Sequence, residues 1–139
     1  MSELDLQKEV PSFQQGEAEV LADRLDRERD IVKKIWQELR LTLCNSGLES
    51  DLNLIPIPDL AEYSIQVDPF DKSESLLGIW RDKHGSKQGE IQIREDGRIY
   101  AEVDVIRNHP TDVRWFVESV TAWGSKDNIK TELRLLPAL

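Results

Sequence analysis

Residues 90–105 read EIQIREDGRIYAEVDV, and this stretch decides the fold. Apolar and polar residues alternate on both sides of residues 96–97, Asp-Gly, so the stretch predicts two antiparallel strands joined by a tight turn. A two-residue turn at Asp-Gly places Ile93 opposite Tyr100 and mixes apolar with polar positions on one face. The alternation therefore predicts a hairpin and leaves its register to be decided by burial.

A loop of three residues, 95–97, gives the hairpin a consistently apolar face. It places Ile93 opposite Ile99 and Ile91 opposite Ala101, and its glycine takes the left-handed conformation of a bulge. A slip of one residue turns every side chain to the other face of the sheet. We therefore predict the register set by the three-residue loop.

Two segments that follow the hairpin also read as strands. In residues 128–136 apolar and polar residues alternate clearly, with Ile129, Thr131, Leu133 and Leu135 inward and Lys130, Glu132 and Arg134 outward. Residues 115–123 are apolar on both sides, which is typical of a central strand or of one whose second face is covered. Simple alternation puts Trp115, Val117, Ser119, Thr121 and Trp123 on one side and Phe116, Glu118, Val120 and Ala122 on the other.

The segment before the hairpin supplies weaker strand signals, and a long helix precedes them. Residues 64–67 are typical of an edge strand, and residues 76–82 of a stronger strand. Residues 17–44 carry apolar side chains at helical spacing: Leu21, Leu25, Val32, Ile35 and Leu39. The sequence thus predicts an α+β fold, with one long N-terminal amphipathic helix packed on a four- to five-stranded antiparallel meander sheet over residues 63–137.

The same apolar stripe has a second interpretation. Its spacing of three and four residues also matches the seam of a coiled coil, in which Glu28 occupies a seam position. The helix is therefore either packed across the sheet of its own chain or paired with the helix of a second copy. A charged residue in the seam favours packing on the sheet.

The chain divides into a tail and one domain. Residues 1–15 are polar, contain Pro11, and predict a flexible tail. Residues 16–139 form the single domain, and Pro56 and Pro58 predict an extended linker over residues 48–62 between helix and sheet.

Composition and charge exclude several classes of partner. The net charge is −9; the first 62 residues hold 14 acidic and 7 basic residues, and the remainder hold 13 and 11. Nucleic acid is a poor partner because no basic cluster is present, whereas a basic protein suits the acidic N-terminal half. No apolar run approaches the length of about 18 residues that spans a bilayer, so membrane insertion is not expected. A single cysteine, Cys44, favours a reducing, cytoplasmic location.

No group of residues predicts catalysis or a cofactor. His84, His109 and Cys44 are scattered, without the spacing of metal ligands or of a nucleophile and its base. The remaining candidates are Glu102 and Asp104, which share a strand face, and Glu118 on the neighbouring strand. Such carboxylates could raise one another's pKa for proton transfer or hold a hard cation, but basic residues on the same face neutralise them more simply. We expect no enzyme, no metal and no cofactor.

The leading hypothesis is a non-enzymatic protein-interaction module: an accessory subunit, an assembly factor or a regulator. Its partner is another protein, basic in character, or a second copy of the chain. The candidate contact residues lie on the helix and on the outer sheet face: Ile35, Trp36, Tyr100, Glu102, Asp104, Phe116 and Glu118.

The alternative hypothesis is a small-ligand-binding domain with an aromatic pocket between helix and sheet. Tryptophans would line that pocket, and an arginine would meet an anionic ligand. The candidates are Trp80, Trp115 and Trp123 with Arg94 and Arg114.

Overall fold

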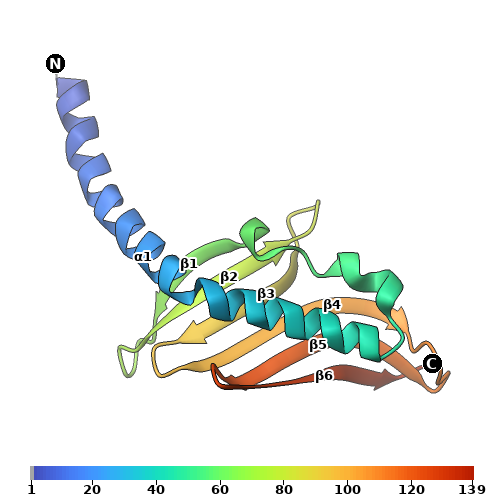
Figure 1. Ribbon diagram of the computed structural model, residues 1–139. Helices are drawn as coiled ribbons and strands as arrows, with labels where there is room; N and C mark the ends of the chain where they lie inside the picture. Colours follow the sequence, from blue (N-terminus) through green and yellow to red (C-terminus); the bar gives the residue numbers. More distant parts are fainter. Residues whose placement is uncertain (1) are drawn as a thin grey trace.

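One long helix and one six-stranded sheet make up the structure, which is a computed structural model (Figure 1). It describes the backbone of residues 2–139 and the side chains of residues 17–139. Helix α1 spans Ser2–Asn45, and two short 3₁₀ helices follow, η1 at Glu49–Leu54 and η2 at Pro58–Leu60. The strands are β1 (Glu62–Val67), β2 (Glu74–Arg81), β3 (Lys87–Arg94), β4 (Arg98–Asn108), β5 (Trp115–Ser125) and β6 (Asn128–Pro137).

The sheet is an antiparallel meander in which each strand pairs with the next along the chain. The α+β class, the long N-terminal helix and the antiparallel sheet are confirmed, but the expected count of four to five strands is wrong because the sheet has six. Strand β1, which contains the edge strand predicted over residues 64–67, brings the count to six. It is a short edge strand with only weak alternation, so its sequence signal is marginal.

The central hairpin has the predicted register. Ile93 pairs with Ile99 and Ile91 pairs with Ala101 across β3 and β4, and Gly97 has a φ of 91°. All four paired side chains are buried. Burial therefore overrides the local preference of Asp-Gly for a two-residue turn.

Strand β5 changes its pattern at a bulge, and this overturns the predicted division of its side chains. Val117 pairs with Leu135 and Ser119 with Arg134, so Glu118 is an extra residue relative to β6. From Ser119 onward the two sides are therefore exchanged: Val120 and Ala122 point inward and are fully buried, while Ser119, Thr121 and Trp123 share the outer face with β4 residues. The sequence suggested two apolar sides because it was read as a strand without a bulge. The bulge brings Val117, Val120 and Ala122 to the same inner face.

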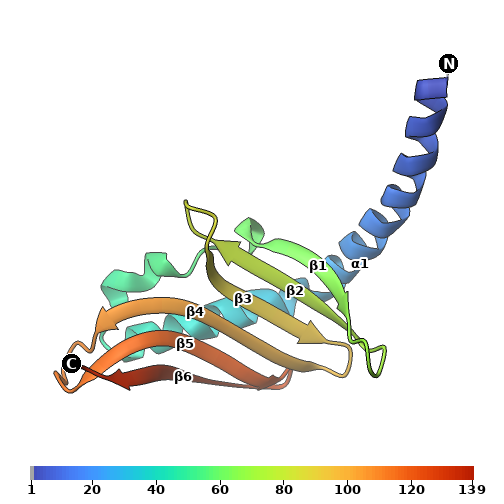
Figure 2. The same ribbon diagram turned by 180° about the vertical axis from the view of Figure 1, so that it is seen from behind.

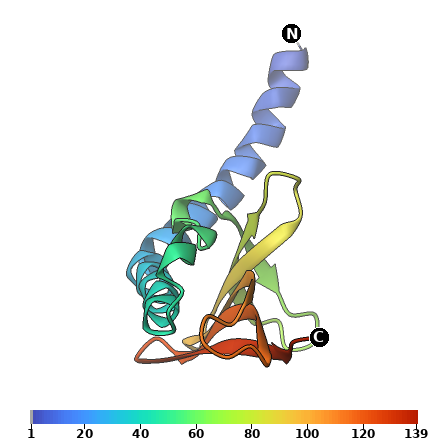
Figure 3. The same cartoon turned by 90° about the vertical axis from the view of Figure 1, so that its right-hand side faces the viewer.

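Helix α1 covers one face of the sheet, which we call the inner face; the opposite one is the outer face (Figures 2 and 3). Ile35, Leu39 and Leu43 of α1 are completely buried. They meet inner-face side chains that are also buried, namely Leu76, Trp80, Ile91, Ile93, Ile99, Ala101, Val103, Val105, Val117, Val120 and Ala122. The core of the domain is the layer between α1 and the sheet.

The start of α1 and the form of the linker differ from the sequence expectation. Pro11 and Gly16 weaken a helix and suggested a start at residue 17, but α1 runs through both from Ser2. The flexibility of residues 1–15 stays a prediction. The linker over residues 48–62 is not extended throughout, because it contains η1 and η2, and Pro58 occupies the first turn of η2, where a missing N–H costs nothing.

The N-terminal part of α1 projects beyond the β1 edge of the sheet (Figures 1 and 2).

A group of three charged side chains, which we call the charge cluster, lies where the helix first meets the sheet. Arg24 and Glu28 are 3% and 5% exposed and form an ion pair, with Nε and Oε1 3.4 Å apart. Lys126, in the turn after β5, places its Nζ 2.8 Å from Oε2 of Glu28. The guanidinium of Arg24 also donates to the carbonyl oxygen of Ile93 at 3.2 Å. The charge cluster therefore ties α1 to the ends of β3 and β5.

Removing the central carboxylate should destabilise the domain strongly. Glu28→Gln leaves the buried Arg24 and the partly exposed Lys126 without their counter-charge, at a cost of about 3 kcal/mol of unfolding free energy. Asp30→Asn, an exposed change on the same helix, should cost under about 0.5 kcal/mol. Urea unfolding followed by tryptophan fluorescence compares the two variants, and equal midpoints would contradict a structural role of the charge cluster.

Candidate functional site

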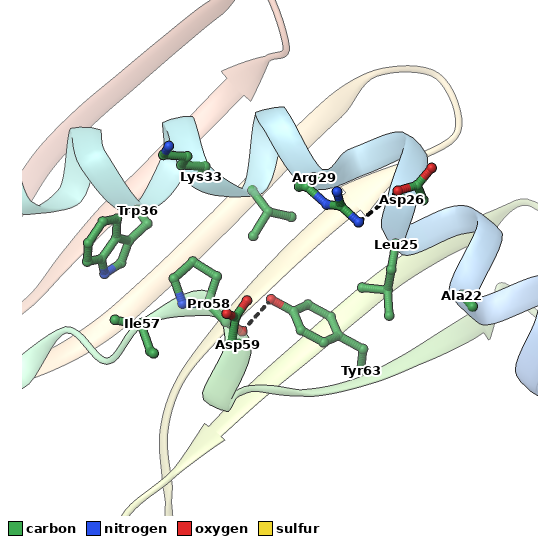
Figure 4. Close-up of a pocket in the computed structure, with 11 residues that line it drawn as sticks. Ala22, Leu25, Asp26, Arg29, Lys33, Trp36, Ile57, Pro58, Asp59 and Tyr63 are labelled. Atoms are coloured by element: carbon green, nitrogen blue, oxygen red, sulfur yellow. Dashed lines mark hydrogen bonds and ion pairs between the residues drawn. The ribbon is translucent and has the colours of Figure 1, made fainter.

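An open groove lies where α1, η2 and β1 meet (Figure 4). Its volume is about 720 Å³. Most of its lining is apolar and comes from both sides: Ala22, Leu25, Val32 and Trp36 from α1, and Ile57, Pro58 and Tyr63 from the linker and β1. We call this feature the groove.

Tyr63 forms the floor of the groove on the β1 side. Its ring lies over Gly78 of β2, where an added Cβ would stand 2.5 Å from the ring. The absence of a side chain at residue 78 is therefore what lets the ring lie flat against the sheet. The hydroxyl donates to the carbonyl oxygen of Pro58 at 2.8 Å. Burial, with the nearby Asp59 carboxylate, raises the pKa of Tyr63 to about 12.

The linker wall of the groove is held in place by side-chain donors. Trp80, which is 1% exposed, donates its indole N–H to the carbonyl oxygen of Ile57 at 3.0 Å. Trp36 donates to Ile55 at 3.4 Å, and Gln88 donates to the carbonyl oxygen of Leu54 at 2.8 Å. With Tyr63, these donors satisfy carbonyl groups along a proline-containing segment that lacks the hydrogen bonds of a strand or long helix. The groove therefore has a preformed wall.

The rims of the groove carry charges of both signs. On α1, Arg29 forms an ion pair with Asp26 at 2.8 Å, between exposed side chains, and Lys33 lies one turn further along. Asp59 of η2 stands on the opposite rim. Figure 4 shows the Trp36 and Tyr63 rings with Leu25 around the space between these rims. The groove thus combines an apolar floor with polar groups at its mouth.

The outer face brings together four of the predicted partner residues. Tyr100, Glu102 and Asp104 lie in a row on β4, and the Glu118 charge acts on Asp104 from the bulge of β5. Burial, with the charges of Glu102 and Glu118, raises the pKa of Asp104, although Lys87 opposes the shift. The Tyr100 hydroxyl donates to Glu102, and burial together with this bond raises the pKa of Tyr100 to about 12.

A shallow polar hollow of about 200 Å³ lies beside this row. Its polar lining comes from Lys87, Gln88, Glu90, Glu102 and Asp104, and Lys87 is ion-paired to Glu90. Across the outer face, further ion pairs join Arg81 to Glu62 and Arg94 to both Asp71 and Asp96. The outer face therefore combines ion pairs with a group of carboxylates that these pairs do not include, Glu102, Asp104 and Glu118.

The remaining partner candidates lie apart from this row. Ile35 of α1 is completely buried between the helix and the sheet, so it has no surface that a partner could contact in the folded domain. Trp36 is partly buried, lines the groove, and carries the guanidinium of Arg40 over its ring at 4.6 Å. Phe116 lies near the start of β5, where it pairs with Asn108 and Leu136. The helix candidates and the outer-face candidates are thus on opposite faces of the sheet.

The predicted ligand-pocket residues are not brought together. Trp80 is in the core, whereas Trp123 lies on the outer face between Tyr100 and Lys130. Arg94 is on the outer face, Trp115 begins β5, and Arg114 is an exposed loop residue that pairs with Asp112. The concavity between helix, linker and sheet is lined by different aromatic residues, Trp36 and Tyr63.

Histidine and cysteine have local roles in the described part of the chain. His109 accepts the backbone N–H groups of Thr111 and Asp112 through Nδ1, at 3.2 and 3.0 Å, and so shapes the β4–β5 loop. Cys44 is a half-buried free thiol near the end of α1. Among the described residues, no three His, Cys, Asp or Glu side chains gather in an arrangement able to hold a metal ion.

Sequence reasoning missed the groove because its parts come from three separate segments. One signal was present: Gly78 lies inside an otherwise regular strand, and such a glycine marks a close approach by another group. The spacing of four residues on the helix predicts a pair of Arg24 with Glu28, and this pair is confirmed. Lys126 was missed as the second partner of Glu28, because residue 126 is remote from the helix in sequence.

Comparison of the chain with protein-family models, with curated proteins and with solved structures found no match. In the part of the chain that the structure describes, no helix is long and apolar enough to cross a membrane. The described residues form an α+β fold, with one long helix on a six-stranded antiparallel sheet and an open apolar groove.

The raised pKa of Asp104 predicts a stabilising substitution. A carboxyl whose pKa is raised on folding favours the folded state while it is protonated, below its ordinary value of 3.8. That advantage is lost as the pH rises through the raised value. At pH 7 the charge opposes folding, so Asp104→Asn should increase the melting temperature, and at pH 3 the gain should vanish. Glu95→Gln, in the exposed β3–β4 turn, is the control, and an Asp104→Asn protein less stable at pH 7 would contradict the prediction.

Proposed function

We propose that this protein is a non-enzymatic interaction module that binds an apolar segment of a basic protein partner in the groove. Accessory subunits, assembly factors and regulators work in this way, and the chain would act as one of them. The observation that carries the proposal is the groove itself, an apolar concavity with a preformed wall and polar rims.

The groove leaves apolar side chains exposed to water. Ile57, which lines it, is 47% exposed, and Leu60, in the same short helix η2 as the lining residues Pro58 and Asp59, is 68% exposed. A partner side chain that fills the space between the Trp36 and Tyr63 rings would remove apolar surface from water at roughly 25 cal/mol per Å². Aromatic anchors of this kind carry much of the binding energy at protein interfaces. The wall already fixed by Trp80 and Gln88 reduces the ordering cost of binding.

Charge supports a basic partner. The groove rims are balanced, with Asp26 and Asp59 against Arg29 and Lys33, so the preference for a basic partner comes from the charge of the whole chain, which is −9. Complementary charge accelerates association and suppresses unsuitable partners more than it adds affinity. Binding should therefore weaken as salt is added.

A second candidate function, binding of a small amphipathic ligand, is supported by the size of the groove. Its volume of about 720 Å³ lies within the range typical of ligand sites, which is about 300–1,000 Å³. Trp36 and Tyr63 would stack on the ligand, and Lys33 and Arg29 would meet an anionic group. The residues proposed for this function are therefore those of the groove, in place of the five predicted from sequence.

A matched pair of variants tests the proposed function. Ile57→Arg and Leu41→Arg each replace an apolar side chain that is about half exposed, 47% and 51%, by a cation. Only Ile57 lines the groove. Affinity capture from the native source, followed by titration of the captured partner, should show at least tenfold weaker binding for Ile57→Arg and no change for Leu41→Arg. Circular dichroism checks that both variants stay folded. A partner bound equally by both variants would place binding outside the groove.

The second candidate is tested with an anionic fluorescent probe, 1-anilinonaphthalene-8-sulfonate. Ala22→Trp should fill part of the groove and lower the probe's fluorescence at saturation, because the apolar space is occupied by the new side chain. Leu41→Trp, elsewhere on the same helix, should leave the probe signal unchanged. Equal probe signals for both variants would count against a ligand site in the groove.

A further inference from the structure

The two edges of the sheet differ in how they are protected. The sheet is open, with β1 at one edge and β6 at the other. Strand β6 carries Lys130, Glu132 and Arg134 on its outer face and ends at Pro137, and charges and proline discourage pairing with another strand. Strand β1 reads EYSIQV and contains neither lysine, arginine nor proline. Its free backbone groups are therefore open to a further strand.

The sequence of β1 is complementary to itself in one antiparallel register. A two-fold axis at Ser64 places Ser64 opposite its own copy and Glu62 opposite Gln66, all on the outer face. On the inner face the same register places Tyr63 opposite Ile65 of the second copy. These faces match the pairing of β1 with β2, in which Tyr63 and Ile65 meet Gly78 and Leu76 while Ser64 meets Leu77.

The charges of that register are also compatible. Each Glu62 carboxylate, whose side chain is 72% exposed, would face a neutral amide and not a second carboxylate. Like charges placed directly opposite each other destabilise a strand pair, so this arrangement avoids a penalty that an acidic chain would otherwise incur. Beyond β1, the projecting part of α1 extends on the side where the second copy would lie (Figure 1).

We propose that β1 is a dimerisation edge, at which a second copy of this chain pairs antiparallel about Ser64 and joins two six-stranded sheets into one. This surface is the backbone edge of β1, and it differs from the groove that is proposed to bind a partner protein. Six residues per strand form a small interface, so the dimer is weak and depends on protein concentration.

Cysteine cross-linking tests the register directly. Directly opposed residues of antiparallel strands have Cα atoms about 4.5–5.5 Å apart, a separation that a disulfide accepts. In a Cys44→Ser background, Ser64→Cys should therefore form a covalent dimer on mild oxidation. Gln66→Cys is the matched control on the same strand and face. Its two copies would be four residues out of register, about 13 Å apart, and should not cross-link.

Charge variants test the same register without a covalent bond. Gln66→Lys creates two symmetric pairs with Glu62 of the other copy, and Gln66→Glu places like charges there. Sedimentation equilibrium should show a dimer dissociation constant lowered by about 2- to 30-fold for Gln66→Lys and raised by a similar factor for Gln66→Glu. Both changes lie on the exposed side of an edge strand, and thermal unfolding verifies that the monomer fold is kept.

The outcomes separate the proposal from its alternatives. Cross-linking of Ser64→Cys alone, with opposite effects of the two Gln66 variants, supports dimerisation through β1. Wild-type chains that remain monomeric at the highest concentration tested would overturn it. A dimer that cross-links equally through both cysteines, or that ignores the charge at residue 66, would also overturn it, because association would then use another surface.

Discussion

The structure depends on burial of the apolar stripe of α1 against the inner face of the sheet. Ile35, Leu39 and Leu43 lose all contact with water there, opposite Ile93 and Val103, which are equally buried. Each such side chain contributes about 1.5–3 kcal/mol when it leaves water. The helix covers the apolar inner face of the sheet and shares one buried cluster with it, so the helix is a structural part of the domain. The same burial means that this part of the stripe is not available to a second helix while the domain is folded.

The helix changes role along its length. Toward the N-terminus from the charge cluster of Arg24, Glu28 and Lys126, α1 leaves the sheet (Figure 1). The groove runs alongside this part of the helix, since its α1 lining extends from Ala22 to Trp36. A buried carboxylate with two cations is a costly way to attach a helix, and a hydrophobic substitute is often as stable.

Much of the fold could be predicted because burial decides between discrete alternatives. The hairpin of β3 and β4 had two candidate registers, and only one buried Ile93 and Ile91 together. The bulge at Glu118 could not be predicted in this way. Both sides of β5 are apolar, so neither face of an unbroken strand was clearly preferred, and the exchange of faces appears only when the registers with β4 and β6 are known together.

The candidate site was less predictable than the fold, for a related reason. Its residues are ordinary core and surface types, and they become a site only through tertiary placement. Tyr63 depends on the absence of a side chain at Gly78, and Ile57 depends on the indole of Trp80 that holds its carbonyl oxygen. Glu28 is a charged residue in an otherwise apolar helical seam, and the structure explains its position by the ion pair with Lys126. A single sequence does not reveal such long-range pairs, because neither partner forms a recognisable motif.

The central claim is that α1 is core along its second half and surface before Arg24, and amide hydrogen exchange tests it most directly. Residues 31–43 should exchange only through global unfolding, with the same protection as β4, since both are buried in one layer. Residues 17–23 should exchange much faster in the isolated protein. Fast exchange across residues 31–43, with β4 still protected, would contradict the account, because it would show that the sheet is stable without the helix on its inner face.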